Sequence, residues 1–232
     1  MKKRVAILQS NYIPWKGYFD LLASVDEFIV YDEVQYTKND WRNRNKVKTP
    51  QGTIWLTIPV ITADRFGQTI KEAEINGTDW AERHWQTIRS NYLRAPYFTE
   101  LERILLPIYE FPDHSISNFN VRLIKAVANY LHLTTKISDC MDFGLIDGKT
   151  ERLVDLCKKA NATTYVSGPA AKNYLDERLF KEAGIDVDWF DYSGYREYPQ
   201  LWGGFEHAVS IIDLLLNCGK SSGDYMKYVP PV

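Results

Sequence analysis

The sequence predicts an α/β fold with a mostly parallel sheet, and three observations support this. Short apolar runs alternate with helical patterns near the start of the chain, at residues 5–31, and again near its end, at residues 151–192. Such alternation is typical of strand–helix–strand units with parallel strands. The middle of the chain, about residues 78–133, carries only helical patterns. We therefore expect one domain over residues 1–232, with this helical block as a layer or subdomain.

The first strand–helix–strand unit positions the candidate site. The run Val5–Leu8 is short and apolar enough for a strand buried on both faces. Apolar residues three and four apart predict a helix over 18–25, and a second strand follows at 28–31. In such units ligands bind outside the carboxyl ends of the strands. The polar segments 9–17 and 32–48 follow the two strands, so we expect the site there.

The later elements follow from periodicity and from turn residues. The expected elements are a hairpin at 46–60, a short strand at 70–75, helices at 80–93, 97–109, 117–131 and 151–160, a strand at 162–166, a turn at 167–172, a helical turn at 179–183, a strand at 185–192 and a last helix at 209–216. Asp213 lies on this apolar last helix, and because an isolated buried charge is costly we expect it to have a partner. The tail from Lys220 is expected to be flexible.

Composition narrows the class of protein. The net charge of −2 does not favour a general nucleic-acid or membrane surface. The three widely spaced cysteines, Cys140, Cys157 and Cys218, form no CxxC pair, which argues against a disulfide framework or a zinc site and indicates reduced, buried thiols. No apolar run approaches the ~20 residues of a membrane span. The basic first residues lead directly into a strand rather than a signal-peptide core, so we expect a cytoplasmic protein.

The segment 38–48 is locally cationic. It holds five lysines or arginines and one acid, Asp40. In a strand, Arg42 and Arg44 would share one face, and two adjacent guanidinium groups suit a carboxylate or a phosphate. The other interpretation is a solvated surface loop or hairpin, since runs of charge usually lie on the surface. The residues alone leave both open.

The polar segments supply candidates for substrate binding and for catalysis. Amides can pair with hydroxyl groups, aromatic rings can stack on a sugar or base, and cations can hold phosphate or carboxylate groups. The candidate binding residues are Gln9, Asn11, Tyr12, Trp15, Lys16, Tyr18, Gln35, Tyr36, Lys38, Trp41, Arg42, Asn43 and Arg44, with Ser167 and Lys172 in the turn after the strand at 162–166. Asp32, at the end of the second strand, and His84 are the candidate bases, although a lone histidine within a helix is more often structural.

Several motifs in order resemble the WbqC-like family of bacterial proteins, over nearly the whole chain. They are QSNYIPWKGYF at 9–19, DEVQY at 32–36, WRNR at 41–44, WLTIP at 55–59, HW at 84–85, NY at 91–92, APYF at 95–98, KTER at 149–152, SG at 167–168 and SIIDLL at 210–215. Two departures are visible, Ser10 and His207, which stand where the family more often has proline. Neither is itself a candidate site residue, although each can reshape its loop.

The resemblance implies a setting in O-antigen and related surface-polysaccharide biosynthesis, with transfer of glycine or another amino-acid or acyl group to a sugar. The implied partner is a sugar or nucleotide sugar rather than a nucleic acid, and no cofactor or oligomeric state is indicated. The first unit is also similar to nucleotidylyl transferases and pantothenate-synthetase-like ligases. Their HxGH signature falls here on residues 14–18, which contain no histidine.

Three functions therefore remain open. The first is a transferase that attaches an amino-acid or acyl group to an amino sugar, with Asp32 or His84 as the base. The second is an ATP-dependent ligase or a nucleotidyl transferase that uses the same loop. The third is a non-catalytic protein that binds a sugar or nucleotide within a polysaccharide assembly complex.

Overall fold

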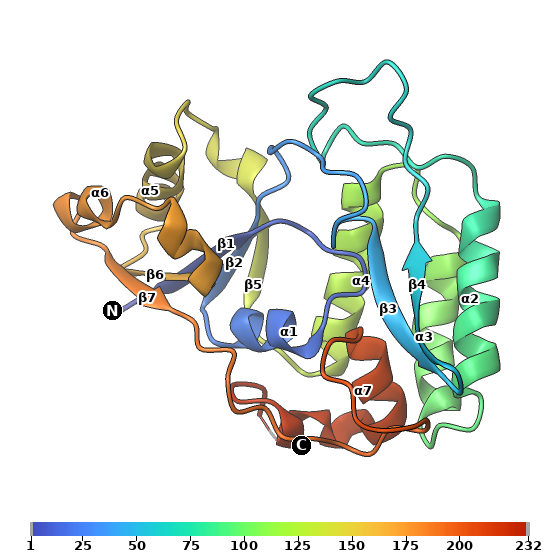
Figure 1. Cartoon of the computed structure of the whole chain (residues 1–232). Helices are drawn as coiled ribbons and strands as arrows, with labels where there is room; N and C mark the ends of the chain where they lie inside the picture. Colours follow the sequence, from blue (N-terminus) through green and yellow to red (C-terminus); the bar gives the residue numbers. More distant parts are fainter. Residues whose placement is uncertain (1, 231–232) are drawn as a thin grey trace.

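A five-stranded parallel sheet forms one half of the computed structural model, which describes residues 2–230 (Figure 1). The strand order is β5 (Lys136–Asp139), β2 (Glu27–Val30), β1 (Arg4–Leu8), β6 (Thr164–Ser167) and β7 (Asp186–Trp189). All four neighbouring pairs are parallel. The predicted α/β class with a mostly parallel sheet is thus confirmed.

Alternate residues of the central strands face two separate apolar clusters. Val5 and Ile7 of β1 pack with α5 (Thr150–Lys159) and α6 (Glu177–Glu182) on one face of the sheet. Ala6 lies on the other face, in a larger cluster that also contains residues of α1 (Lys16–Ala23). Because neighbouring residues in a strand point to opposite faces, an apolar run with no polar alternation is what a strand buried on both faces requires.

The other half of the molecule is helical, as predicted, and carries a hairpin of its own. Its elements are β3 (Arg44–Thr49), β4 (Gly52–Thr57), α2 (Asp79–Tyr92), α3 (Phe98–Glu110), α4 (Ile116–Tyr130) and α7 (Ile211–Cys218). The hairpin forms a separate two-stranded antiparallel sheet rather than part of the main one. Apolar residues of α2, α3, α4 and α7 share the larger cluster with one face of the main sheet, so the two halves have a continuous core.

Short 3₁₀ helices complete the chain at Cys140–Phe143, Pro169–Asn173 and Gly219–Tyr225. The second of these replaces the turn expected at 167–172. Cys140, Cys157 and Cys218 are free thiols and are buried, as the sequence indicated. Within residues 2–230, no helix is long and apolar enough to cross a membrane.

The strand predicted at 70–75 is wrong. Ile70, Ala73 and Ile75 are buried, which gave the segment its apolar pattern. However, its backbone forms turns and isolated bridges: the amide of Ile70 donates to the carbonyl of Val34, and Ile75 pairs with Val60. An alternating pattern shows which side chains are buried, but a strand also needs a continuous partner strand, and none lies beside this segment.

The prediction of a flexible tail from Lys220 is wrong for residues 220–230. Residues 231 and 232 lie outside the described part of the chain. Ser222 is buried, and the amides of Lys227 and Tyr228 donate to the carboxylate of Asp20 at 2.9 and 2.7 Å. These residues are therefore held in place rather than flexible.

Asp213 has hydrogen-bond partners, as expected for a carboxylate on an apolar helix. Tyr92 Oη and Gln200 Nε2 donate to its carboxylate at 2.7 and 2.8 Å, and burial raises its pKa above the ordinary value of 3.8.

Candidate functional site

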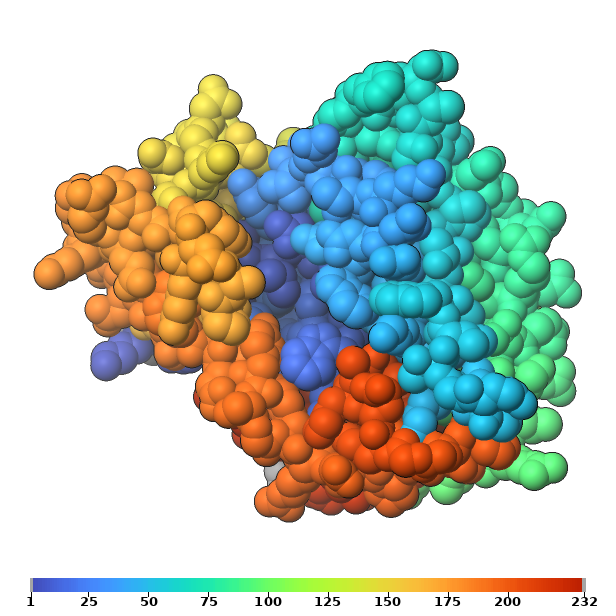
Figure 2. All heavy atoms as spheres, in the orientation of Figure 1, coloured from blue at the N-terminus to red at the C-terminus, as the bar shows by residue number. Residues whose placement is uncertain are grey.

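The carboxyl ends of the parallel strands bring the predicted polar segments to one edge of the sheet. Gln9 follows β1 and Asp32 follows β2 closely, while Ser167 ends β6, beside β1. Figure 2 shows a recess at this edge, whose floor is the dark blue segment after β1. The orange segment after β6 lies on one side and the lighter blue segment after β2 on the other. The expected position of the site therefore coincides with a real depression in the surface.

Beside this recess lies a hollow of about 320 Å³, here called the tryptophan hollow. It is lined by Asn11, Pro14, Trp15, Trp41, Asn45, His207 and Ala208. Three of these, Asn11, Trp15 and Trp41, were predicted as binding residues. In the sequence, Asn45 was noticed only as part of the cationic segment 38–48, Pro14 only as part of the motif at 9–19, and His207 only as a departure from the family pattern. Ala208 gave no signal.

Trp15 forms one wall because α1 begins directly after it. Its ring folds over the first turn of the helix, where a Cβ atom on Gly17 would lie 2.3 Å from the indole. The rings of Tyr192 and Tyr195 pack against it, with centroids 5.3 and 5.7 Å away. Glycine at position 17 thus allows the indole to approach the backbone closely.

Hydrogen bonds hold the loop after β1 against the hairpin. The amide of Tyr12 donates to the carbonyl of Trp41 at 2.9 Å. Asn45 Nδ2 donates to the carbonyls of Tyr12 and Ile13 at 3.2 and 2.9 Å. Ile13 has a φ of 34°, a strained backbone conformation that residues other than glycine rarely adopt. These contacts fix the relative positions of Asn11 and Trp41.

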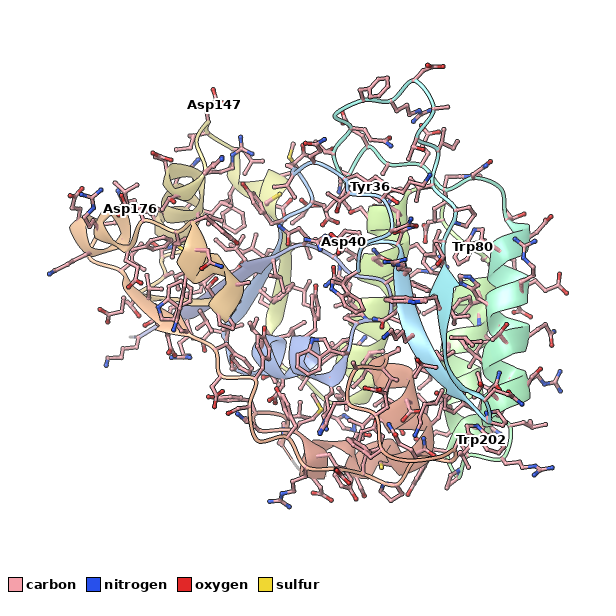
Figure 3. All side chains as sticks on the ribbon, viewed as in Figure 1. Tyr36, Asp40, Trp80, Asp147, Asp176 and Trp202 are labelled. Atoms are coloured by element: carbon pink, nitrogen blue, oxygen red, sulfur yellow. The ribbon has the colours of Figure 1, made fainter. Side chains whose placement is uncertain are left out.

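The long connection between β7 and α7 supplies the last wall. It has no regular secondary structure and ends where the amide of Ser210 donates to the carbonyl of Lys46 at 2.9 Å. The amide of Ile211 donates to the carbonyl of Pro14, also at 2.9 Å. These two bonds place His207 and Ala208 opposite the tryptophans. Earlier in this connection, Trp202, labelled in Figure 3, donates its indole N–H to the carbonyl of Asn91 at 2.9 Å.

Asn11 is the polar side chain of the hollow that lacks a partner. Its Oδ1 is buried and receives no hydrogen bond from the described residues. More than nine tenths of buried polar groups have a partner, so an unpaired one calls for an explanation. Half a turn of the amide exchanges its oxygen and nitrogen, so the group can present either an acceptor or a donor. Asn11 lines the hollow, but its Oδ1 points away from solvent, so the amide must turn before this oxygen meets a hydroxyl or an amine there.

The arginine pair that one of the two interpretations required does not form, because β3 begins at Arg44 and Arg42 lies in the preceding turn. Arg42 donates to Gln9 Oε1 and to Asp40 Oδ2, at 3.0 Å each. Burial tends to raise the pKa of Asp40, but hydrogen bonds and the charges of Arg42 and Arg44 outweigh it and lower this pKa. Arg44 instead stacks on Trp55, at 4.2 Å from its ring centroid.

Asp32 is enclosed by what we call the Asp32 cluster, made of Ser10, Asp32, Ser117 and Asn120. Asp32 is 2% exposed. Its carboxylate accepts hydrogen bonds from the amide and hydroxyl of Ser10, at 2.8 and 2.7 Å, and from the hydroxyl of Ser117, at 2.6 Å. Asn120 donates in turn to the carbonyl of Arg42 at 2.8 Å. A carboxylate so engaged has no access to a substrate proton and instead joins the loops after β1 and β2 to α4.

The two family departures lie next to the candidate residues. Ser10 donates two of the three hydrogen bonds to Asp32, so it directly contacts a predicted base. A proline there would lack both the N–H and the hydroxyl. His207 lines the hollow itself. Both departures therefore bear on the site.

His84 belongs to a second enclosed group, far from Asp32 in the chain. Its Nδ1 lies 2.8 Å from the hydroxyl of Tyr12, which also contacts the hydroxyl of Tyr109 at 2.9 Å. Trp80, which Figure 3 marks beside the hairpin, packs on the imidazole edge to face. Burial lowers the pKa of His84 from 6.5 to about 4. The imidazole is therefore neutral near pH 7, and neither predicted base lines the hollow.

The other candidates divide between core and surface. Tyr18 is buried and donates its hydroxyl to the carbonyl of Gln9 at 3.0 Å. Lys16 lies between the rings of Tyr195 and Tyr198, and burial lowers its pKa from 10.5 to about 8. Tyr12, Tyr36 and Asn43 are buried, whereas Gln35 and Lys38 are exposed. Tyr36 is labelled with Asp40 in Figure 3, on the connection between β2 and β3.

Ser167 and Lys172 lie across the recess from this connection. Ser167 is buried at the end of β6, while Lys172 is exposed, with its Nζ 5.4 Å from the ring of Trp189. The structure thus brings Asn11, Trp15 and Trp41 together in the hollow, places Gln9 and Arg42 beside one another, and leaves the remaining candidates apart. Across residues 2–230, no group of three or more histidine, cysteine, aspartate or glutamate side chains could hold a metal ion.

Comparisons with known proteins agree with the motifs. The chain is 56% identical over 227 residues to the uncharacterized protein Rv1507c of Mycobacterium tuberculosis (strain ATCC 25618 / H37Rv), an alignment that covers 97% of this chain and 98% of the relative. No solved structure matches the chain significantly, so the similarity of the first unit to nucleotidylyl transferases stays a prediction. The model of the WbqC-like protein family matches residues 9–225. The chain therefore belongs to the WbqC-like protein family.

Proposed function

We propose that this protein is a transferase of surface-polysaccharide biosynthesis, which attaches an amino-acid or acyl group, glycine among them, to the amine of an amino sugar held in the tryptophan hollow. The observation that carries the proposal is a hollow lined by two indole rings and by Asn11, whose Oδ1 has no hydrogen-bond partner among the described residues. Sugars have apolar faces that stack on aromatic rings and hydroxyl groups that pair with amides. The family setting favours a polysaccharide precursor as the substrate.

The size of the hollow supports a small acceptor. Its volume of about 320 Å³ lies at the lower end of the range for small-molecule sites, roughly 300–1,000 Å³. Trp41 is 44% exposed, so part of its ring is open to a ligand.

The reaction requires one proton acceptor. The amine nitrogen attacks the carbonyl carbon of an activated acyl donor, such as a thioester, whose leaving group departs as the new amide forms. The amine proton must pass to a base. Because Asp32 and His84 are enclosed, we assign this role to His207, the ionisable side chain of the hollow wall. This assignment replaces the two bases expected from the sequence.

A transfer assay with matched variants tests the proposal. Purified protein is incubated with UDP- and dTDP-linked amino sugars and with acyl-CoA donors, and mass spectrometry detects the acylated sugar. His207→Gln should abolish most turnover while it preserves binding, and Asn11→Ala should weaken binding. Asn129→Ala, an exposed asparagine of α4, is the control that should change neither.

A thermal-shift screen of the same ligands gives a second test. A ligand that binds only the folded protein stabilises it by about 2.7 kcal/mol at a hundredfold excess over its dissociation constant. A shift with an amino sugar or its nucleotide derivative is expected. A shift with ATP alone, together with release of AMP or pyrophosphate, would favour the ligase or nucleotidyl transferase instead. Sugar binding without any product from any donor would favour the non-catalytic binding protein.

A further inference from the structure

The outer face of the hairpin carries an aromatic and cationic surface, here called the Trp55 face, made of Trp41, Arg44, Lys46 and Trp55. Lys46 pairs with Trp55 across the two strands, and Arg44 lies on the same face two residues earlier. Trp55 is 41% exposed and Trp41 is 44% exposed, with their ring centroids 5.6 Å apart. Adjacent exposed indole rings indicate a binding surface more often than an isolated exposed side chain does.

The two cations on this face are held by the ring of Trp55 rather than by acids. The guanidinium carbon of Arg44 lies 4.2 Å and Lys46 Nζ lies 5.1 Å from its centroid. Within residues 2–230, neither side chain has a carboxylate within ion-pair distance. Stacking on an indole therefore orders both cations and leaves their N–H groups free for an anion.

Asp40, the one acid in the segment 38–48, is already engaged. Asp40 accepts hydrogen bonds from Arg42 at 3.0 Å and from Thr37 at 2.7 Å. Its charge offsets that of Arg42, which leaves the positive charges of Arg44 and Lys46 as a local excess. The whole chain has a net charge of −2, so this local excess favours a small anion over a polyanion or a membrane surface.

The combination points to one class of ligand. Exposed indole rings stack on planar bases, and a guanidinium beside an ammonium suits two adjacent phosphates. Trp41 belongs to both surfaces, since it lines the tryptophan hollow and packs beside Trp55. Figure 2 shows the light blue hairpin directly beside the recess, on the same side of the molecule. One ligand can therefore extend from the hollow onto the hairpin.

We propose that the Trp55 face binds the nucleoside diphosphate part of a nucleotide-linked amino sugar, whose sugar occupies the tryptophan hollow. The base stacks on the exposed indole rings, and Arg44 and Lys46 hold the diphosphate. This inference rests on the proposed function for the sugar, but the nucleotide contacts can be tested separately. The acceptor sugar would thus reach the protein as a nucleotide-linked sugar.

The test is isothermal titration calorimetry with the parts of such a ligand. The probes are UDP, dTDP, GDP and ADP, inorganic pyrophosphate, and free glucosamine. The double variant Arg44→Gln, Lys46→Gln should raise the dissociation constant of the preferred nucleoside diphosphate by about tenfold or more, equivalent to about 1.4 kcal/mol. Lys125→Gln is the matched control, since Lys125 is an exposed lysine on α4 with no assigned binding role, and it should change nothing. Circular dichroism checks that the variants fold.

The results separate the two proposals. If glucosamine binds and loses affinity in Asn11→Ala while no nucleoside diphosphate binds, the Trp55 face is overturned and the proposed function stands. If a nucleoside diphosphate binds through Arg44 and Lys46 while no sugar binds the hollow, the proposed function is overturned and the Trp55 face stands as a nucleotide site. Pyrophosphate binding as tightly as the nucleotides would overturn the base-stacking part. Binding to anionic lipid vesicles that is lost in the double variant, without nucleotide binding, would replace the nucleotide by a membrane surface.

Discussion

Ser10 and Asn11 are neighbours in the chain, yet their side chains lie in opposite surroundings. Ser10 belongs to the Asp32 cluster, in which the carboxylate accepts three short hydrogen bonds. Asn11 faces the tryptophan hollow with a buried Oδ1 that has no donor among the described residues. Both follow the same strand at the carboxyl edge of the sheet. In our proposal the first of these side chains serves the fold and the second serves a ligand, and the following variants test that difference.

The largest expected effect on stability comes from removing the carboxylate of the Asp32 cluster. We expect Asp32→Ala to lower the free energy of unfolding by about 4 kcal/mol, because three buried donors would lose their acceptor at roughly 1–3 kcal/mol each. Urea denaturation, monitored by tryptophan fluorescence, measures this loss. A loss below about 1 kcal/mol would mean that the cluster does not hold these loops together, and the comparison with the hollow would fail.

His84 extends the comparison to pH. Its pKa falls from 6.5 to about 4 on burial, so between these values the unfolded chain binds a proton that the folded chain does not. The stability that His84 contributes is therefore present above pH 6.5 and is lost as the pH falls through 4, by about 3 kcal/mol in total. The stability advantage of the wild type over His84→Gln should shrink by this amount between pH 7 and pH 4. An advantage that is constant with pH would contradict the enclosed, neutral imidazole.

Ser10→Ala sharpens the comparison within the cluster. The variant loses the hydroxyl that donates to Asp32 at 2.7 Å but keeps the amide that donates at 2.8 Å. One hydrogen bond to a charged group contributes about 2 kcal/mol, so we expect a loss near this value. Denaturation by urea under the conditions used for Asp32→Ala gives the ratio of the two losses. Equal losses would mean that the hydroxyl alone organises the carboxylate.

The smallest expected effect on stability is that of Asn11→Ala. Because its Oδ1 has no donor, its removal should change the free energy of unfolding by no more than about 0.5 kcal/mol. The measurement is the same denaturation, made beside Ser10→Ala. A substantial loss of stability would show that Asn11 supports the loop, and the amide would no longer be evidence for a ligand.

The fold was largely predictable because its signals are local. The apolar run Val5–Leu8 and the alternation of strands with helices predicted the parallel sheet, and capping and periodicity predicted the helical block. The prediction at 70–75 was wrong because burial of Ile70 and Ile75 against loops gives the same pattern as a strand. The flexible tail was wrong because the acceptor of its amides, Asp20, lies about 200 residues earlier.

The candidate site was predictable in position but not in roles. The rule that ligands bind at the carboxyl ends of parallel strands located the edge, and Asn11, Trp15 and Trp41 lie together there. Asp32 looked like a base because nothing near it in sequence shows that Ser117 would donate to its carboxylate. His207 is brought to the hollow by an irregular connection, whose path depends on the hydrogen bonds of Ser210 and Ile211. Long-range contacts of this kind have no sequence periodicity.

The position of β1 in the middle of the sheet has a consequence for synthesis of the protein. Its first neighbour, β2, is translated soon afterwards, but its second neighbour, β6, comes much later, and Lys3 bonds to Thr163 across a sequence separation of 160 residues. On the ribosome, one edge of β1 therefore stays unpaired while most of the chain is made. Exposed strand edges pair readily with other chains. Nascent chains that end before Thr164 should therefore aggregate or bind chaperones, and release from this state should coincide with the emergence of β6.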